Sequence, residues 1–229
     1  MTKNHLKRLN TPKTWDIVRK GITFITRPNP GAHSLEDGVS LNLLIRDMLG
    51  LAKNKREVRR ILLENNVLVD GIRRKDHRFC TGFMDVIKFT ELKEQYRVVI
   101  GVNGKLGAIK IDEKDSNVKL CKIVGKKLVG GKIQFNLFDG KNILAEKGDY
   151  KVGDTLAISV PKQEIKSCLK LEKGSLICLT GGSHIGEIGH VEDIISNRIK
   201  CKVKKGDVFE TLKDYAFVIG KSKPEVQVE

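Results

Sequence analysis

Aromatic residues are scarce in this sequence of 229 residues, which holds eight Phe, three Tyr and a single Trp. They are not interleaved with the basic clusters, where proteins that bind single strands place aromatic platforms for unpaired bases. Sequential base stacking is therefore disfavoured relative to contacts with a nucleic-acid backbone or its shape. Trp15 and Phe24 do lie in a basic segment, and we interpret them as its hydrophobic anchors.

Long apolar runs are also missing. No stretch approaches the roughly 20 apolar residues that a bilayer span needs. The N-terminus is polar and basic, without the apolar core of a signal peptide. The sequence predicts a soluble, cytoplasmic protein with no membrane partner.

Paired cysteines and catalytic motifs are absent as well. The five cysteines (Cys80, Cys121, Cys168, Cys178 and Cys201) never stand two residues apart, so neither a zinc knuckle nor a disulfide framework is indicated. We expect them to be small buried residues. The sequence has no His-Glu-x-x-His and no Gly-x-Ser-x-Gly. It therefore predicts no catalytic residue, metal, cofactor or small-molecule substrate.

What the sequence has in excess is positive charge. Lys and Arg total 43 against 28 Asp and Glu, giving a net charge of +15. A chain this basic repels itself unless a polyanion shares its environment, so nucleic acid is the leading class of partner. Eleven of the twelve arginines lie at or before Arg97. Because arginine makes the planar, bidentate phosphate contact, the first half is predicted to be the more specific anchor.

The pattern along the chain changes several times. Residues 1–38 are basic and rich in proline. They are predicted to form an arm that cannot bury a core of its own and therefore lies against a surface outside the segment. Apolar residues at the helical period follow Ser40 and predict a first helix, and a second helix is predicted after Asn54. Residues 67–74 are predicted to form a strand that enters a tight turn, and residues 84–89 are the strand expected to pair with it. From residue 91 onward, Ile, Val and turn pairs predict β-rich structure, with a break near Pro161.

The helix predicted over 54–65 carries the strongest single feature. Val58, Ile61 and Leu62 fall on one face, and four basic residues (Lys55, Arg56, Arg59 and Arg60) fall on another. A solvated surface is the ordinary explanation for such charges. However, four like charges on adjacent turns repel one another, and a phosphate backbone would relieve that repulsion.

Two features near the C-terminus indicate contact with nucleic acid less strongly than this helix does. The glycine-rich stretch 181–189 is not a nucleotide P-loop, because Glu187 stands where the lysine belongs. It is either a hairpin turn or a loop that lets the backbone approach a nucleic acid. Farther on, Lys200, Lys202 and Lys204 alternate with apolar residues, which predicts a strand with one cationic face.

Particular motifs resemble a known family. The sequences HLKRLNTPKTW (5–15) and RPNPGAH (27–33) closely resemble the N-terminal signature of the archaeal and eukaryotic small-subunit ribosomal protein family S-four-e (S4e). VLVDG (67–71) and GFMDV (82–86), with the helix pair, resemble an embedded S4-type RNA-binding domain. Residues 174–191 resemble a KOW motif with Gly186 at its glycine position. The loop differs from the family in Ser183, His184 and Glu187, where basic residues are common.

The resemblance implies an α+β, multidomain fold: a basic N-terminal arm (1–38), a small helical/β S4-type RNA-binding domain (39–90), a β-rich central domain (91–170), an SH3-like KOW barrel (171–220) and a tail (221–229). It implies a structural constituent of the small ribosomal subunit, with ribosomal RNA and neighbouring ribosomal proteins as partners. The predicted RNA-binding residues are Lys7, Arg8, Lys13, Trp15, Arg19, Arg27, His33, Lys55, Arg56, Arg59, Arg60, Arg73, Arg74, Gly182, His184, Gly186, Lys200, Lys202 and Lys204.

Two alternatives belong to other classes. S4-type domains also precede pseudouridine synthase domains, but those enzymes carry a catalytic Asp in a Gly-Arg-Leu-Asp setting that this sequence lacks. A KOW-containing transcription factor would leave the N-terminal signature unexplained.

Overall fold

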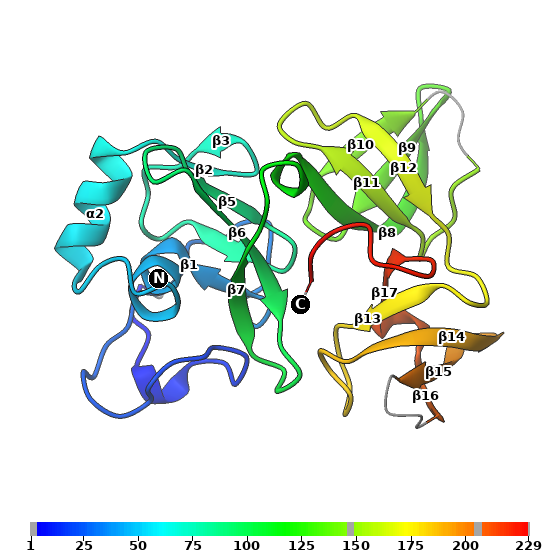
Figure 1. Ribbon diagram of the computed structural model, residues 1–229, viewed down its shortest axis with the longest axis horizontal. Coiled ribbons are helices and arrows are strands. Elements are labelled where there is room, and N and C mark those ends of the chain that lie inside the picture. The colour runs from blue at the N-terminus through cyan, green and yellow to red at the C-terminus, as the bar shows by residue number, and fades with distance from the viewer. Residues whose placement is uncertain (1–3, 146–148, 204–207, 229) are drawn as a thin grey trace. The chain divides into compact units, whose positions relative to one another are not determined.

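The computed structural model describes residues 4–145, 149–203 and 208–228, and the fold is mostly β with few helices. The chain forms two compact units (Figure 1). The first contains Met1–Val99 and Lys105–Ser116, and the second contains Ile100–Gly104 and Asn117–Glu229.

The two predicted helices lie in the first unit. The first of them begins as α1 (Leu41–Leu43) and continues as the π-helical turn η2 (Leu44–Met48). Leu41, Leu44 and Ile45 are fully buried, so the apolar period sets the face that packs. Helix α2 spans Lys55–Glu64 and buries Val58 and Leu62.

The first unit also holds a five-stranded sheet in the order β3-β2-β5-β6-β7. Its strands are β2 (Val67–Val69), β3 (Ile72–Arg73), β5 (Val86–Phe89), β6 (Glu94–Ile100) and β7 (Leu106–Lys110). Asp70 and Gly71 both have positive φ, as a tight hairpin turn between β2 and β3 requires. The predicted pairing of the strand at 67 with residues 84–89 is confirmed, since β2 pairs with β5. The short strands β1 (Gly38–Ser40) and β4 (Cys80–Gly82) pair separately.

The division expected between residues 90 and 91 differs from the one in the structure. Strand β5 pairs with β6 along four residues, from Val86 opposite Arg97 to Phe89 opposite Glu94. A boundary there would split one sheet and leave the backbone groups of both strands unpaired. The first unit therefore extends to Ser116, past the short 3-10 turn that begins at Asp115.

The N-terminal segment is also not a separate arm. Trp15 is only 1% exposed, and Leu6 and Ile25 are buried. The backbone amide of Leu106 donates to the Thr14 carbonyl oxygen, and Lys7 forms an antiparallel bridge with Phe24. The segment includes the 3-10 turn Arg8–Asn10. We expected it to need an apolar surface outside itself, and it packs against the rest of its own unit.

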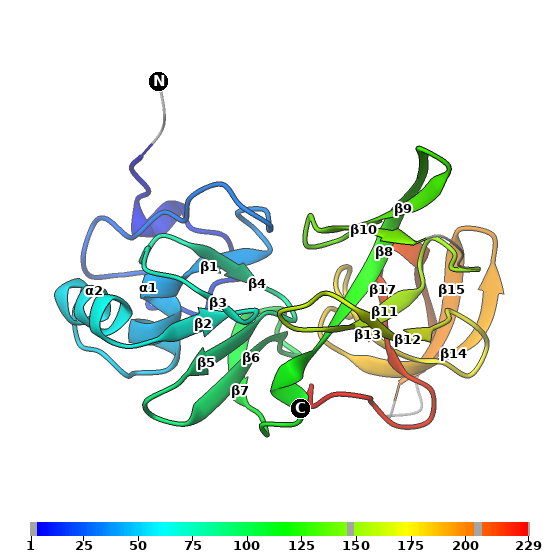
Figure 2. The ribbon, with the colours of Figure 1, turned by 90° about the horizontal axis from the view of Figure 1, so that it is seen from above.

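The second unit contains two five-stranded sheets. One has the order β10-β9-β8-β11-β12, with β8 (Val118–Val129), β9 (Lys132–Leu137), β10 (Asn142–Ala145), β11 (Thr155–Ser159) and β12 (Ile165–Leu169). Strand β8 is long, as Figure 2 shows: its first half pairs with β11 and its second half with β9. A register shift beside Val124 separates the halves. Ile123, Phe135 and Leu156 are fully buried in the core of this sheet.

The other sheet has the order β16-β15-β14-β13-β17. Its strands are β13 (Leu176–Leu179), β14 (Ile188–Ile195), β15 (Arg198–Val203), β16 (Val208–Leu212) and β17 (Ala216–Gly220), with the 3-10 turn Lys213–Tyr215 before the last. The predicted alternation in β15 is confirmed, since Ile199 and Cys201 are buried while Arg198 and Lys202 are exposed. Both sheets belong to one compact unit, although we expected two domains here.

Candidate nucleic-acid interface

Helix α2 begins at a complete N-terminal cap. The side-chain oxygen of Asn54 accepts hydrogen bonds from the backbone amides of Arg56 (2.9 Å) and Glu57 (3.0 Å). The Glu57 carboxylate reaches back to the Lys53 amide at 2.6 Å and to the Asn54 side-chain amide at 2.7 Å. These bonds satisfy donors that the first turn leaves free, and they fix the direction of the helix.

The cap and the buried face together determine where the basic side chains point. Because Val58 and Leu62 are buried, Lys55, Arg56, Arg59 and Arg60 are all exposed. We call these four residues the α2 basic face. Among these four, and within the described part of the chain, only Arg60 has a carboxylate partner: the two oxygens of Glu64 accept from its Nε at 2.9 Å. An exposed pair of this kind contributes only about 0.3–0.5 kcal/mol, so a phosphate can compete for Arg60.

The loop after β3 lies near the α2 basic face. His77 is buried, and its pKa is lowered first by that burial and then by the positive charges of Lys55 and Arg59. Arg78, on the same loop, also lowers the pKa of His77, whereas Asp76 raises it. Cations of the helix and of this loop thus act on the same buried histidine. No pattern in the sequence indicated that His77 and Arg78 belong beside the helix.

Arg73 and Arg74, which lie before this loop, are partly occupied by the fold. Arg73 Nη2 donates to the Leu63 carbonyl at 3.1 Å, near the end of α2. The Arg74 guanidinium lies 4.3 Å from the centre of the Phe79 ring, in a cation–π contact. Arg73 nevertheless remains exposed, and Arg74 is half-buried.

The N-terminal basic residues divide into two groups. Lys7 and Lys13 are exposed. Arg8 is buried, and its guanidinium donates to the Val18 carbonyl at 2.6 Å. Arg19 donates to the carbonyls of Thr11 and Pro12 at 3.1 and 3.0 Å. Trp15 donates from its indole nitrogen to the Gly38 carbonyl at 2.9 Å. The structure therefore uses Arg8, Trp15 and Arg19 to hold the segment in place.

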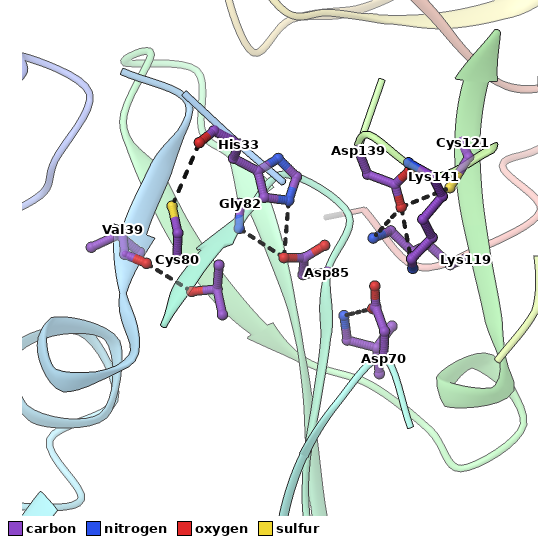
Figure 3. Close-up of polar contacts among 12 residues, drawn as sticks. His33, Val39, Asp70, Cys80, Gly82, Asp85, Lys119, Cys121, Asp139 and Lys141 are labelled. Atoms are coloured by element: carbon purple, nitrogen blue, oxygen red, sulfur yellow. Dashed lines mark hydrogen bonds and ion pairs between the residues drawn. The ribbon is translucent and has the colours of Figure 1, made fainter. Parts of the chain in front are cut away.

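His33 is buried like Arg8, whereas Arg27 is only half-buried. His33 Nε2 lies 3.0 Å from the Asp85 carboxylate, and both side chains are almost fully buried (Figure 3). The same Asp85 oxygen accepts from the Gly82 amide at 2.9 Å. His33 is therefore a core residue rather than a surface one. Arg27 is half-buried, and its carbonyl accepts from Arg78 Nε at 3.2 Å, which connects it to the loop beside α2.

The glycine-rich loop of the second unit is organised by aromatic rings. The His184 ring stacks on Phe209 with centroids 3.8 Å apart, and its Nδ1 lies 3.0 Å from Glu187. Gly182 is exposed with a φ of +86°. Gly186 is buried with a φ of +82°, a conformation that favours glycine. Within the loop, Gly182 and His184 are accessible, whereas Gly186 has a conformational role.

The cationic face of β15 is partly neutralised. Lys200 Nζ lies 3.4 Å from Glu210 on the neighbouring strand β16, and Arg198 lies 3.7 Å from the same carboxylate. Lys202 is exposed. Lys204, also a predicted contact, lies outside the described residues.

Some lysines elsewhere are not available to a ligand. Lys119, only 2% exposed, lies 3.0 Å from the buried Asp139 carboxylate, and Lys141 lies 3.2 Å from it (Figure 3). The two ammonium groups help to lower the pKa of Asp139 despite its burial. Lys122 donates to the Asp214 carbonyl at 2.7 Å, and burial lowers its pKa to about 8. These cations stabilise the second unit from within.

The described residues provide neither a metal site nor a membrane-spanning helix. Among the described residues, no group of three or more His, Cys, Asp or Glu side chains is placed to hold a metal ion. All five cysteines are free thiols. Four of them are buried, whereas Cys168, which we also expected to be buried, is half-buried. No helix in the described ranges is both long and apolar enough to span a bilayer.

Exposed basic faces on a mostly β scaffold are typical of proteins that bind nucleic acid. The family described as ribosomal family S4e matches residues 92–165, and the RS4NT domain matches residues 2–36. The chain is 43% identical over 234 residues to small ribosomal subunit protein eS4 of Methanosphaera stadtmanae, covering 99% of this chain and 96% of that one. The same protein of Methanocella arvoryzae is also 43% identical over 234 residues, covering 99% and 98%.

A solved structure agrees. The crystal structure of the 30S ribosomal protein S4e from Thermoplasma acidophilum is 36% identical, with a TM-score of 0.70 over 81% of this chain and 96% of that one. The chain therefore belongs to the family of small ribosomal subunit protein eS4. That family consists of structural ribosomal proteins and is not a class of enzymes.

Proposed function

We propose that this protein is a structural constituent of the small ribosomal subunit, in the cytoplasm, and that it holds ribosomal RNA through the α2 basic face. The observation that carries the proposal is the exposure of four cations on two turns of one helix, of which Arg60 alone has a carboxylate partner among the residues that the structure describes. Arginine on a rigid, capped helix can make bidentate phosphate contacts without a large loss of side-chain freedom.

Other surfaces extend this contact in our proposal. Lys7, Lys13 and Arg73 are exposed in the first unit. In the second unit, the β13–β17 sheet serves as a KOW-type, SH3-like barrel that contacts RNA through Gly182, His184 and Lys202. Neighbouring ribosomal proteins are the remaining partners, and no cofactor is required. The ribosomal names of the relatives favour neither a pseudouridine synthase nor a transcription factor.

The test is incorporation into the small subunit. Arg56→Ala combined with Arg59→Ala should reduce the amount of protein that sediments with small subunits after a salt wash, because two phosphate contacts are lost. Arg59→Lys retains the charge but not the bidentate geometry, so it should give an intermediate loss.

The matched control is Lys114→Ala, which removes an exposed cation of the same unit from outside the α2 basic face. It should sediment like the wild type. Equal sedimentation of the double arginine variant and the control would exclude α2 from the RNA contact. A wild-type protein that fails to sediment with small subunits would overturn the proposed function itself.

A further inference from the structure

Strands β8, β9 and β10 lie side by side and present a face that belongs to none of the surfaces described above (Figure 1). Directly opposed residues of antiparallel strands point to the same side of a sheet. The register opposes Lys127 to Gln134, and Gln134 to Leu144. Their neighbours Phe135 and Ile143 point to the other side, where the core of this sheet lies. Lys127, Gln134 and Leu144 therefore point away from that core.

This outward face is cationic and rich in side-chain amides. Following the same alternation, its members are Gly125, Lys127, Val129, Lys132, Gln134, Asn136, Asn142 and Leu144. We call it the amide–lysine face. All eight are exposed or half-exposed. None is a carboxylate, whereas on β15 in the same unit Lys200 has Glu210 opposite it.

The polar groups of this face retain unused hydrogen-bonding capacity. Gln134 Nε2 donates to Asn136 Oδ1 at 2.9 Å, which leaves the Gln134 oxygen and the Asn136 amide group to other partners. Lys127 makes no ion pair with any described residue. Gly125 adds no side chain opposite Asn136, so this amide stays accessible. Donors, acceptors and a cation thus lie together on an open, three-stranded surface.

The chemistry of the face favours one ligand. The minor groove of an RNA helix is wide and shallow, and it displays 2′-hydroxyls and base edges that amides can bind. Lysines at the edge of the face can reach the flanking phosphates. The face has no aromatic side chain on which unpaired bases could stack. Exposed Val129 and Leu144 offer apolar contacts for ribose.

We infer that the amide–lysine face binds the minor groove of a double-stranded segment of small-subunit ribosomal RNA. This inference rests on the proposed function and adds to it a second contact, in the other compact unit, with a stated form of RNA.

The experiment uses the full-length protein carrying Lys127→Ala, Gln134→Ala and Asn136→Ala together. Filter binding to purified small-subunit rRNA should show an affinity reduced by about tenfold or more, since hydrogen bonds and a phosphate contact are lost at once. The wild type should also prefer an RNA duplex to the DNA duplex of the same sequence, because only RNA has 2′-hydroxyls. The triple variant should lose this preference.

Lys166→Ala is the matched control, because Lys166 is an exposed lysine on β12, at the opposite edge of the same sheet. It should retain both the affinity and the preference. Thermal melting of each variant shows that the unit is folded, and Lys127→Arg should bind like the wild type because it keeps the charge.

Three results would overturn the inference. Unchanged rRNA affinity of the folded triple variant would exclude this face from the RNA. Normal binding to naked rRNA with poor incorporation into subunits would identify a neighbouring protein as the partner instead. Failure of the wild type to bind small-subunit rRNA would overturn the proposed function as well. The first two results concern the variant only, so they leave the proposed function intact.

Discussion

Gly82 leaves the space that the buried His33–Asp85 pair occupies. A Cβ at position 82 would lie 2.4 Å from His33 Cγ and 2.7 Å from the Asp37 carbonyl oxygen. Gly82→Ala should therefore destabilise the first unit by about 1–3 kcal/mol, the usual cost of forcing extra volume into a packed site. Chemical denaturation followed by the fluorescence of Trp15 measures this, because the protein's single tryptophan is buried in that unit.

Gly107→Ala is the control. Gly107 lies on β7 of the same unit, and a Cβ there would meet no atom within 4 Å. This substitution should leave stability nearly unchanged. If both substitutions had the same effect, the close packing of His33 against Gly82 would be contradicted.

His77 should make the stability of the first unit depend on pH. Burial and the charges of Lys55, Arg59 and Arg78 lower its pKa in the folded protein, against the opposing effect of Asp76. The unfolded chain, with an ordinary histidine pKa near 6.5, then binds a proton at a pH where the folded protein does not. The free energy of unfolding should therefore fall as the pH drops below about 6.5.

His77→Gln should reduce this dependence, measured as the difference in the free energy of unfolding between about pH 5 and pH 7. His5→Gln, which changes an exposed histidine of the same unit, serves as the control and should keep the wild-type slope. Identical slopes for all three proteins would show that His77 is not the titrating group.

Among the elements, α2 depends on its N-terminal cap. Asn54→Ala removes an oxygen that accepts from two backbone amides. We expect a loss of about 1 kcal/mol in the free energy of unfolding of the first unit, as for other capping residues. Asn54→Asp retains the acceptor and should retain most of the stability. A neutral effect of Asn54→Ala in denaturant titrations would contradict the cap.

The same helix shows which parts of a fold the sequence can predict. The cap at Asn54, the buried positions Val58 and Leu62 and the exposed basic face all follow from residues within one dozen positions. Strands β1 and β4 were not predicted. Each has only three residues, and Gly38 pairs with Gly82, far away in the sequence. Long-range pairings of such short segments leave no period to detect.

The candidate site was predictable to a similar extent. Charge and helical periodicity were sufficient for Arg56 and Arg59. They could not show that Arg8 would be buried, because one of its guanidinium nitrogens donates to the carbonyl of Val18, ten residues away. Nor could they show that Glu64 would pair with Arg60, or place His77 beside the helix. A count of cations does not distinguish a surface group from one that the fold uses.

At the scale of the whole molecule, guanidinium and ammonium groups should contribute differently to RNA affinity. Arg56→Ala and Arg59→Ala should each reduce the slope of log affinity against log salt by about 0.7 to 1, as expected for one lost phosphate contact. Lys200→Ala should cost less, because Glu210 already neutralises part of its charge. Filter binding to small-subunit rRNA over a range of salt concentrations measures both effects.

Arg60→Ala provides an internal comparison, since Glu64 competes with phosphate for its guanidinium. It should reduce the slope less than Arg59→Ala does. Equal effects of the helix arginines and the strand lysine would indicate diffuse attraction between a basic protein and RNA, without a defined contact.

The uneven distribution of arginine gives the two units different sensitivities to chemistry at primary amines. Eleven of the twelve arginines belong to the first unit, and Arg198 is the exception. Acetylation abolishes the charge of a lysine but does not affect a guanidinium. Progressive acetylation of the exposed lysines would therefore remove most of the positive charge of the second unit, whereas the first unit would keep its eleven arginine charges. A single reagent, without any mutation, would separate the contribution of the guanidinium groups from that of the ammonium groups.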